Sequence, residues 1–352
     1  MSEAQPTKKR RANFAMLNRE VIKPGYCVSC GGCEAVCPVY VISIEQLIPK
    51  LVGGCISCGA CVDICLRYKQ RKEQPIYDET SLGEIMEIYK GHSIYGDVRE
   101  RAQNGGIVTT LLLNAMRKGD IDGALVTGHI NDLLGPVPRL ALNELDIRKS
   151  ARSKYVLNPL LIKLTSIKLS HKDSVAVVGL PCHIDTLTNV IDKKNLGADH
   201  RVKYKIGLFC MSSYNPRDFR NILSQNLGLD AEELTKTDCA RGKFFFVAPD
   251  GTTDIKIKEC AEAKAEGCKY CKDFSAEFAD ISIGNVGVDD DSNLIIIRTQ
   301  AGKELFDLAL QENILDVEKV EQDKWEETLA AALKLSSVKK RTTKSLPPIE
   351  TN

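Results

Sequence analysis

The chain has 352 residues, of which 43% are hydrophobic and 27% charged, as expected for an ordinary globular protein with a sizeable core. Its formal net charge of +1 gives no electrostatic reason to expect nucleic-acid binding, and no apolar run approaches the roughly 18 residues of a membrane span. Fourteen cysteines, with no hydrophobic signal core after the basic run Lys8–Arg11, predict a reducing, cytoplasmic setting.

Both ends of the chain are polar and basic. We expect flexible basic tails over residues 1–20 and 336–352. Most tails of this kind are simply solvated. Docking to an acidic partner or to an anionic membrane surface is the alternative.

Eight cysteines near the start form two copies of one spacing, C-x2-C-x2-C-x3-C, and a proline follows the first copy. This spacing is typical of a two-cluster ferredoxin, in which the fourth cysteine of each run binds the cluster of the other run. We therefore predict a two-cluster 4Fe–4S domain over residues 21–67. One cluster is assigned to Cys27, Cys30, Cys33 and Cys65, and the other to Cys55, Cys58, Cys61 and Cys37.

Zinc knuckles and disulfides are the competing interpretations of these cysteines. Zinc sites usually pair two C-x2-C units across a longer gap, and a reducing compartment disfavours disulfides. Small residues between the cysteines, such as Gly31, Gly32 and Gly59, let backbone N–H groups approach the sulfurs. The second run departs from the pattern only in having Leu66 in place of proline.

After a polar linker at 68–81, strand-like and helix-like segments alternate through residues 82–335. This alternation predicts an α/β domain (α+β, with a mixed sheet) behind the small cluster domain. A helix is expected to open after Gly105–Gly106, and others over 216–226, 302–311 and 324–335. Strands are expected over 123–127, 174–179, 205–210, 243–247, 253–257, 280–283 and 294–298.

Six cysteines remain in the larger domain. Cys182 and Cys210 each follow a predicted strand, and Cys268 and Cys271 form a C-x2-C pair. These four predict a cage for a third 4Fe–4S cluster, against the alternative that they are buried small hydrophobic residues. Cys239 and Cys260 stay open as substitutes for one of them.

Short blocks along the larger domain resemble the family of coenzyme F420 hydrogenase/dehydrogenase β subunits. They are Gln103–Thr109, Ser153–Tyr155, Val178–His183, Phe209–Cys210, and Gly267–Asp273 continuing to Ala279–Gly284. The resemblance covers roughly residues 85–300 and implies an FAD site, a pocket for coenzyme F420 and one cluster inside the domain. With the ferredoxin-like start, the chain is most similar to F420-oxidising input subunits of the archaeal membrane F420 dehydrogenase.

The resemblance implies that Gln103, Asn104, Gly105, Gly106 and Thr109 belong to the cofactor site, with the Gly105–Gly106 turn at the FAD pyrophosphate, which suits a helix N-terminus. Lys154 and Tyr155 are candidates for the flavin phosphate or ring, and Gly179 and Pro181 belong to the strand-end block. Arg241 and Lys243, on either side of Gly242, are chosen for their charge as contacts for the acidic tail of F420. The family commonly has aspartate where this chain has Asn104, and the run Asp289–Asp291 replaces its usual glycine and tryptophan.

Together these features predict an oxidoreductase that takes a hydride from reduced F420 onto FAD and passes electrons singly through clusters. Hydride transfer needs no catalytic base, so no residue is assigned a catalytic role, and His183 is expected to pack beside the third cluster. The expected acceptor is a membrane-bound respiratory complex, with the protein peripheral on the inner face of the membrane through that partner. Alternatives are a soluble ferredoxin:F420 oxidoreductase, the F420-reactive subunit of a hydrogenase or formate dehydrogenase, and a non-enzymatic ferredoxin-type carrier.

Overall fold

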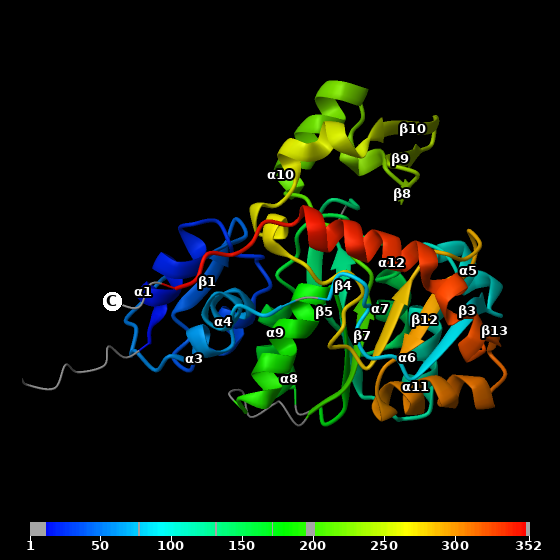
Figure 1. Ribbon diagram of the computed structural model, residues 1–352, viewed down its shortest axis with the longest axis horizontal. Helices are drawn as coiled ribbons and strands as arrows, with labels where there is room; N and C mark the ends of the chain where they lie inside the picture. The colour runs from blue at the N-terminus through cyan, green and yellow to red at the C-terminus, as the bar shows by residue number, and fades with distance from the viewer. Residues whose placement is uncertain (1–11, 77, 131, 171, 195–200, 350–352) are drawn as a thin grey trace, which may run out of the picture.

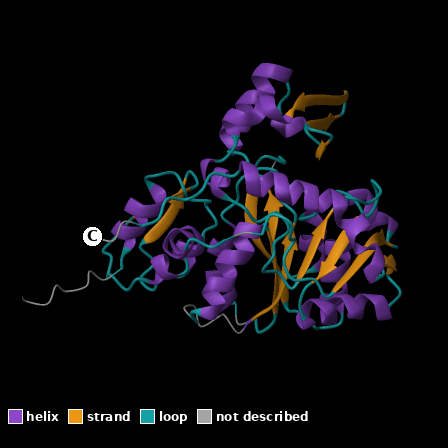
Figure 2. Ribbon diagram, viewed as in Figure 1, coloured by secondary structure: helices purple, strands orange, loops and turns teal. Residues whose placement is uncertain are grey.

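The computed structural model describes residues 12–349 apart from 77, 131, 171 and 195–200. Its largest feature is an eight-stranded sheet in the order β13-β3-β12-β11-β7-β6-β4-β5, with helices on both faces (Figures 1 and 2). The strands are β3 (Glu87–Ser93), β4 (Gly123–His129), β5 (Pro136–Ala141), β6 (Val175–Gly179), β7 (Val202–Leu208), β11 (Ile281–Gly284), β12 (Asn293–Ile297) and β13 (Leu315–Lys319).

The sheet is mixed, as predicted. β4, β6, β7 and β11 run parallel to their neighbours in this group. β5 is antiparallel to β4 at one edge, and β12, β3 and β13 are antiparallel at the other. The carboxyl ends of the four parallel strands therefore meet at one edge of the sheet, where open α/β sheets bind ligands.

Side chains alternate between the two faces of the sheet. On β6, Ala176 and Val178 pack toward the cluster that contains α6 and α11, whereas Val175 and Val177 pack on the opposite face. Each such buried aliphatic side chain contributes roughly 1.5–3 kcal/mol relative to exposure. The helices of this domain are α5 (Gly96–Arg101), α6 (Ile107–Arg117), α7 (Glu144–Lys149), α8 (Leu164–Leu169), α9 (Pro181–Asp192), α11 (Gln300–Gln311) and α12 (Trp325–Thr342).

A second, antiparallel sheet of three strands stands apart from the large one in Figure 1. It consists of β8 (Lys236–Ala240), β9 (Lys243–Ala248) and β10 (Gly251–Lys256), and packs with α10 (Pro216–Ile222). Phe219, Phe244 and Phe246 form its aromatic core. On β9, Phe244 and Phe246 alternate with less buried residues, which is the pattern of a strand with one covered face.

The N-terminal region contains the two cysteine runs. Its elements are α1 (Phe14–Leu17), α2 (Gly32–Ala35), β1 (Ile42–Glu45), β2 (Ile48–Leu51), α3 (Ala60–Asp63) and α4 (Leu66–Glu73). Its core is continuous with the large domain, because Val36 and Ile64 belong to the same buried cluster as Leu161 and Leu187. The small domain is therefore docked on the large one.

The predicted tails need correction wherever the structure describes them. Residues 1–11 lie outside the described part, but residues 12–20 do not form a flexible tail, since Phe14 and Leu17 are buried. At the other end, α12 continues to Thr342, seven residues past the predicted boundary at 335. Basic residues Lys339 and Lys340 are 3% and 4% exposed, because buried backbone carbonyls accept their hydrogen bonds.

Other differences concern the linker and several strands. Helix α4 extends through Glu73, so the first part of the predicted linker at 68–81 is helical. The strands β3, β5, β8 and β13 were not predicted. In β3 and β13, charged residues hide the strand pattern, because Lys319 pairs with Glu87 and Lys90 with Glu318. Among the described residues, no helix is both long enough and apolar enough to cross a membrane.

Candidate functional site

A cavity of about 220 Å³ opens at the carboxyl ends of the parallel strands. Each of the four strands, or the loop directly after it, contributes to the lining, with Thr127 from β4, Gly179 from β6, Phe209 after β7 and Gly284 from β11. A Cβ atom at Gly284 would collide with the ring of Phe209, so the glycine allows this ring to lie against the strand. The mixed topology thus places the cavity where α/β sheets bind cofactors.

The N-terminus of α6 forms one wall of the cavity. Gly106 begins the helix with φ 76°, a left-handed conformation that glycine adopts without strain, and Gly106 and Thr109 both line the cavity. Gly105 does not line it. A Cβ atom there would lie 2.8 Å from the carbonyl oxygen of Gly91 and 2.9 Å from Asn293 Oδ1, so Gly105 serves the close packing of the loop on β3 and β12.

Asn104 ties this loop to the acidic run. Its Nδ2 donates to the carbonyl oxygen of Asp290 at 2.6 Å, and its Oδ1 accepts from Asn285 Nδ2 at 3.0 Å. An aspartate at position 104 could not make the first of these bonds, because a carboxylate has no N–H to donate. The two departures from the family pattern, Asn104 and the run at 289–291, are therefore in contact with each other.

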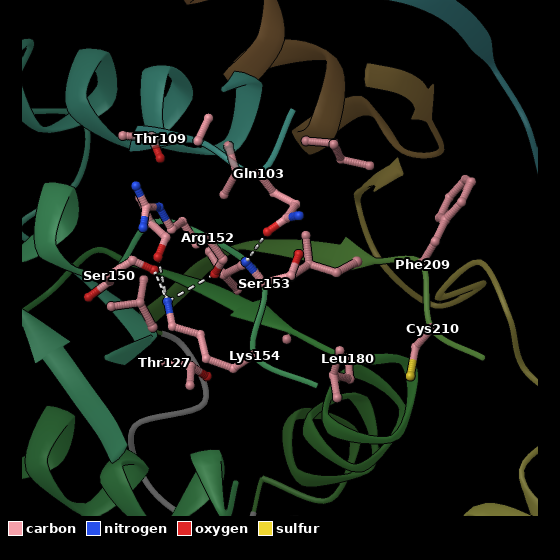
Figure 3. A pocket seen from close by; sticks show the side chains of 18 of the residues that line it. Gln103, Thr109, Thr127, Ser150, Arg152, Ser153, Lys154, Leu180, Phe209 and Cys210 are labelled. Atoms are coloured by element: carbon pink, nitrogen blue, oxygen red, sulfur yellow. Dashed lines mark hydrogen bonds between the residues drawn. The ribbon is translucent and has the colours of Figure 1, made fainter. Parts of the chain in front are cut away.

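Gln103 and Lys154 organise the opposite wall. Gln103 Oε1 accepts from the backbone N–H of Ser153 at 3.3 Å, and its Nε2 donates to Asp238 Oδ1 at 2.9 Å. Lys154 Nζ donates to the carbonyl oxygens of Ser150, Ala151 and Arg152 at 2.6, 2.6 and 2.9 Å (Figure 3). Three acceptors fix the ammonium group beside the cavity.

The environment of Lys154 favours loss of its proton. Burial, and secondarily the nearby positive charge of Arg152, lower the pKa of Lys154 to about 7. An anionic ligand in the cavity would raise this pKa and complete the charge balance. Tyr155 also lines the cavity, with its ring edge-on to Phe244 at 5.3 Å, and burial raises the pKa of its hydroxyl.

Besides Gly105, three predicted cofactor residues do not line the cavity. Pro181 occupies the first position of α9 and lines the neighbouring cysteine pocket instead. Arg241 is exposed in the turn between β8 and β9. Lys243 follows this turn and forms an ion pair with Asp254 at 2.8 Å.

The four predicted ligands of the third cluster converge on one small pocket. Cys182 lies in the first turn of α9, and Cys210 follows β7. Cys268 and Cys271 lie in and directly after the 3₁₀ helix η7 (Glu266–Tyr270). We name these four cysteines the inner set. Cys239 and Cys260 instead belong to the core of the three-stranded sheet and do not line this pocket.

The inner set and the cavity share a wall. The residues that line both are Asn158, Leu180, His183, Cys210, Ser212 and Ser213. His183 Nδ1 accepts from the backbone N–H of Leu180, and its Nε2 lies 3.0 Å from the carbonyl oxygen of Asn158. Burial lowers the pKa of His183 to about 4, so the ring is neutral and serves as a fixed part of this wall.

The chemistry of the inner set suits a metal cluster. Burial, followed by repulsion from Cys271 and Cys268, raises the pKa of Cys182 well above its usual value. A bound cationic metal centre removes both penalties, because thiolates are stabilised by coordination. The backbone N–H of Ser213 also points to Cys268 Sγ at 3.4 Å, which is the type of contact that cluster sulfurs receive.

The ferredoxin-like cysteines line two separate pockets. One pocket is lined by Cys27, Cys30, Cys33 and Cys65, which we name the first set. A second pocket is lined by Cys37, Cys55, Cys58 and Cys61, which we name the second set.

The first set contacts the inner set. A Cβ atom at Gly267 would collide with the carbonyl oxygen of Cys27, so the two cysteine loops touch through their backbones. Val28 lines both pockets. Thr186 Oγ1 donates to Cys30 Sγ at 3.5 Å, and the N–H of Leu161 donates to the carbonyl oxygen of Cys30 at 2.9 Å.

Sequence reasoning missed residues that surround these pockets. Asn158 forms part of the shared wall, and its buried Oδ1 has no hydrogen-bond donor among the described residues. Lys339 lines the inner pocket and was assigned to a tail. Arg67 lies two residues after Cys65, and this adjacency was the one available signal.

Family models match three parts of the chain. Residues 88–164 match the N-terminal model and residues 172–323 the C-terminal model of the coenzyme F420 hydrogenase/dehydrogenase β subunit. Residues 19–66 match a 4Fe–4S dicluster domain.

Individual relatives come from methanogenic archaea. The coenzyme F420-dependent sulfite reductase of Methanocaldococcus jannaschii is 33% identical over 86% of this chain, which spans only 49% of that relative's length. The β subunit of the coenzyme F420 hydrogenase of Methanothermobacter thermautotrophicus is 30% identical over 74% of this chain and 92% of its own length. A subunit of the F(420)H(2) dehydrogenase of Methanosarcina mazei is 26% identical over 83% of this chain and 85% of its own length.

A solved structure extends the likeness to the fold. A chain of the F420-reducing [NiFe] hydrogenase complex from Methanosarcina barkeri superposes with a TM-score of 0.71 at 26% identity. The match covers 76% of this chain and 93% of the other. The chain therefore belongs to the family of coenzyme F420 hydrogenase/dehydrogenase β subunits, and a 4Fe–4S dicluster domain precedes the family domain. This conclusion rests on the two family models matched in order, on a 30% identical relative matched over 92% of its length, and on the shared fold.

Proposed function

We propose that this chain oxidises reduced coenzyme F420 with the help of FAD held in the cavity, and delivers electrons singly through three 4Fe–4S clusters to a partner. The observation that carries the proposal is the order of the sites. The cavity shares a wall with the inner set, and the inner set touches the first set. Electrons released in the cavity would thus meet first the inner set and then the first set.

The residues around the cavity suit a flavin. A flavin accepts a hydride as an electron pair and releases the electrons one at a time, which matches clusters that accept one electron each. The first turn of α6 provides backbone N–H groups and the positive end of a helix dipole for the pyrophosphate. Lys154 supplies a cation, and Asn158 Oδ1 offers an acceptor that no described residue uses.

The cysteine pockets divide the clusters between two tasks. The inner set and the first set are enclosed, and burial is the largest cause that raises the pKa values of Cys33 and Cys182. In the second set, Cys55 and Cys58 are exposed. We assign the enclosed pockets to internal transfer and the exposed pocket to the exit.

The surface around the second set suits a protein partner. Tyr40, Ile48, Val52 and Ile56 are between 50% and 60% exposed, and Leu51 is 42% exposed. Apolar and aromatic side chains of this kind form the centre of protein interfaces, and weak redox encounters need only a small one. A membrane-bound dehydrogenase complex is our proposed partner, because one relative is itself part of an F420H2 dehydrogenase.

The acidic tail of F420 requires cations outside the cavity. Arg241 and Lys243 stay our proposed contacts for its phosphate and carboxylates, because guanidinium and ammonium groups bind such anions. Lys243 would exchange its partner Asp254 for the ligand. Loss of affinity for F420 in an R241Q variant, with FAD content unchanged, would support this assignment.

The decisive experiment is anaerobic titration of the purified protein with reduced F420 while flavin and cluster absorbance are followed together. Metal analysis should give about twelve irons, as three 4Fe–4S clusters require. The flavin band should bleach first and the cluster bands should follow. An absorbance change in the clusters with no bound flavin, or no response to reduced F420, would refute the proposal.

A soluble ferredoxin is the second candidate partner. The same exposed cysteines Cys55 and Cys58 and the same apolar surface would accept a small soluble carrier. Steady-state reduction of added ferredoxin at a rate equal to that of the membrane complex would favour this alternative. A rate far below it would favour the membrane complex.

A further inference from the structure

Arg67 occupies the boundary between the first set and the inner set. It lies in the first turn of α4, two residues after Cys65, and its side chain is 1% exposed. It lines the pocket of the first set. Its guanidinium reaches across to the loop of the inner set, where Nη2 donates to the carbonyl oxygen of Gly267 at 2.9 Å and Nη1 to that of Tyr270 at 2.8 Å.

The positive charge of Arg67 has no carboxylate partner among the described residues. Its hydrogen bonds there go to two backbone carbonyls and to Gln70 Oε1, all of them neutral. Its buried Nε has no acceptor in the described part of the chain. A buried charge without a counter-ion is costly, and such charges are normally paired.

Cysteine pockets lie on both sides of Arg67. Arg67 lines the pocket of the first set, and its guanidinium bonds the loop that carries Cys268 and Cys271 of the inner set. Clusters bound by cysteine thiolates in these two pockets would supply the missing negative charge. The acid Asp185 also feels the charge of Arg67, but burial raises the pKa of Asp185 to about 7, so it is only partly ionised at neutral pH.

Arg71, one turn further along α4, provides the contrast. It is also buried, at 7% exposure, but it forms an ion pair with Glu20 at 2.8 Å and donates to the carbonyl oxygens of Pro347 and Pro348. The same helix therefore carries one arginine that forms an ion pair with a carboxylate and one that, among the described residues, forms hydrogen bonds to neutral groups and no ion pair.

We propose that Arg67 is a positioning residue for electron transfer, whose fixed charge stabilises the reduced state of both the first and the inner clusters. The proposal rests on the proposed function, since it requires a cluster at the inner set. A cation placed between two centres favours an added electron on either of them. It acts through charge alone and adds no bond-making step.

The test is a redox titration, followed by electron paramagnetic resonance, of the cluster-loaded full chain in wild-type form and in the variants R67M, R67K and R71M. R67M should lower the potentials of the first and inner clusters by at least a tenfold change in the reduction equilibrium, or about 59 mV for one electron. R67K, which keeps the charge, should restore most of the loss. R71M should leave both potentials unchanged, and the second cluster should not respond to any variant.

Other outcomes separate the possible failures. Unchanged potentials in R67M with all clusters present would show that Arg67 only fastens the two loops and would overturn the proposal. If R67M does not fold, R67K provides the test. A tenfold shift in the reduction equilibrium of both clusters in R67K, which retains the positive charge, would also overturn the proposal. Wild-type protein with about eight irons and no inner signal would refute the third cluster of the proposed function instead.

Discussion

The two cysteine loops of the N-terminal domain have nearly the same local conformation. Ser29 and Ser57 have φ 54° and 55°, and Gly31 and Gly59 have φ 89° and 86° at the start of short helices. The repeated spacing therefore produces a repeated backbone. Local sequence is sufficient for this, because glycine permits the left-handed turns that bring backbone N–H groups toward the sulfurs.

The surroundings of the two loops are different. The first loop touches the large domain through Leu161, Thr186 and Gly267, and Arg67 lies beside it. The second loop has exposed cysteines and an exposed apolar surface. Two loops of the same cysteine spacing thus lie in different surroundings, and docking rather than spacing decides which loop contacts the large domain.

The largest expected effect comes from removing the cluster of the second set, from which electrons are proposed to leave the protein. C58S should remove or destabilise the cluster of the second set and abolish electron delivery to the partner, while reduced F420 still bleaches the flavin. Rapid-mixing absorbance of the variant measures both steps. Loss of flavin reduction in C58S would contradict the order in which the two loops are placed.

The backbone contact between the loops offers the next test. G267V places a side chain against the carbonyl oxygen of Cys27 and should destabilise the protein by about 1–3 kcal/mol and slow transfer from the inner to the first set. G54V is the control, because a Cβ atom at Gly54 meets nothing within 4 Å. Denaturant unfolding and cluster-reduction rates check both. Equal behaviour of the two variants would mean that the loops do not differ in docking.

A change outside both loops separates the flavin end from the cluster end. K154M should weaken FAD binding by about 1.5–3 kcal/mol at pH 6, with iron content unchanged. Without ligand the pKa of Lys154 is about 7, and bound anionic FAD would raise it. The contribution of Lys154 to FAD affinity is therefore complete below pH 7 and is lost as the pH rises through the pKa that Lys154 has in the FAD complex. Equilibrium dialysis at pH 6 and 9 tests this. An equal pH dependence in wild type and K154M would contradict it.

The apolar surface of the second loop should matter only for the protein partner. I56S should slow delivery to that partner roughly tenfold, since an interface residue often contributes more than 1 kcal/mol. Reduction of a small dye should stay at the wild-type rate. L169S, which alters an exposed leucine on α8, is the control and should change neither rate.

The smallest expected effect concerns the hydroxyl of Thr186 on α9, which donates to the first loop. T186V removes the hydrogen bond to Cys30 Sγ, which contributes about 0.5–1.5 kcal/mol. The loss should lower the reduction potential of the first cluster by roughly 20–65 mV. T188V on the same helix is the control, because its hydroxyl contacts Lys205 rather than sulfur. A shift of equal size in T188V would show that the effect is not local to the sulfur.

Part of the site could be predicted from the sequence because it depends on short-range patterns. The paired cysteine runs predict two pockets, and Gly105–Gly106 predicts the start of α6. Asn158, Arg67 and Lys339 were not readable. Each acquires its role from contacts with residues far away in the sequence, such as the bonds from Arg67 to Gly267 and from Lys339 to the carbonyl oxygen of Cys210.

The sequence by itself predicted which cysteines line a common pocket and that a mixed α/β domain follows them, since spacing and hydrophobic period act over a few residues. Only the tertiary structure decided that the first set faces the inner set and that Cys55 and Cys58 of the second set face solvent. It also turned the predicted tail around Lys339 into a buried helix. These outcomes depend on burial of charge and apolar surface between distant segments, which no local pattern encodes.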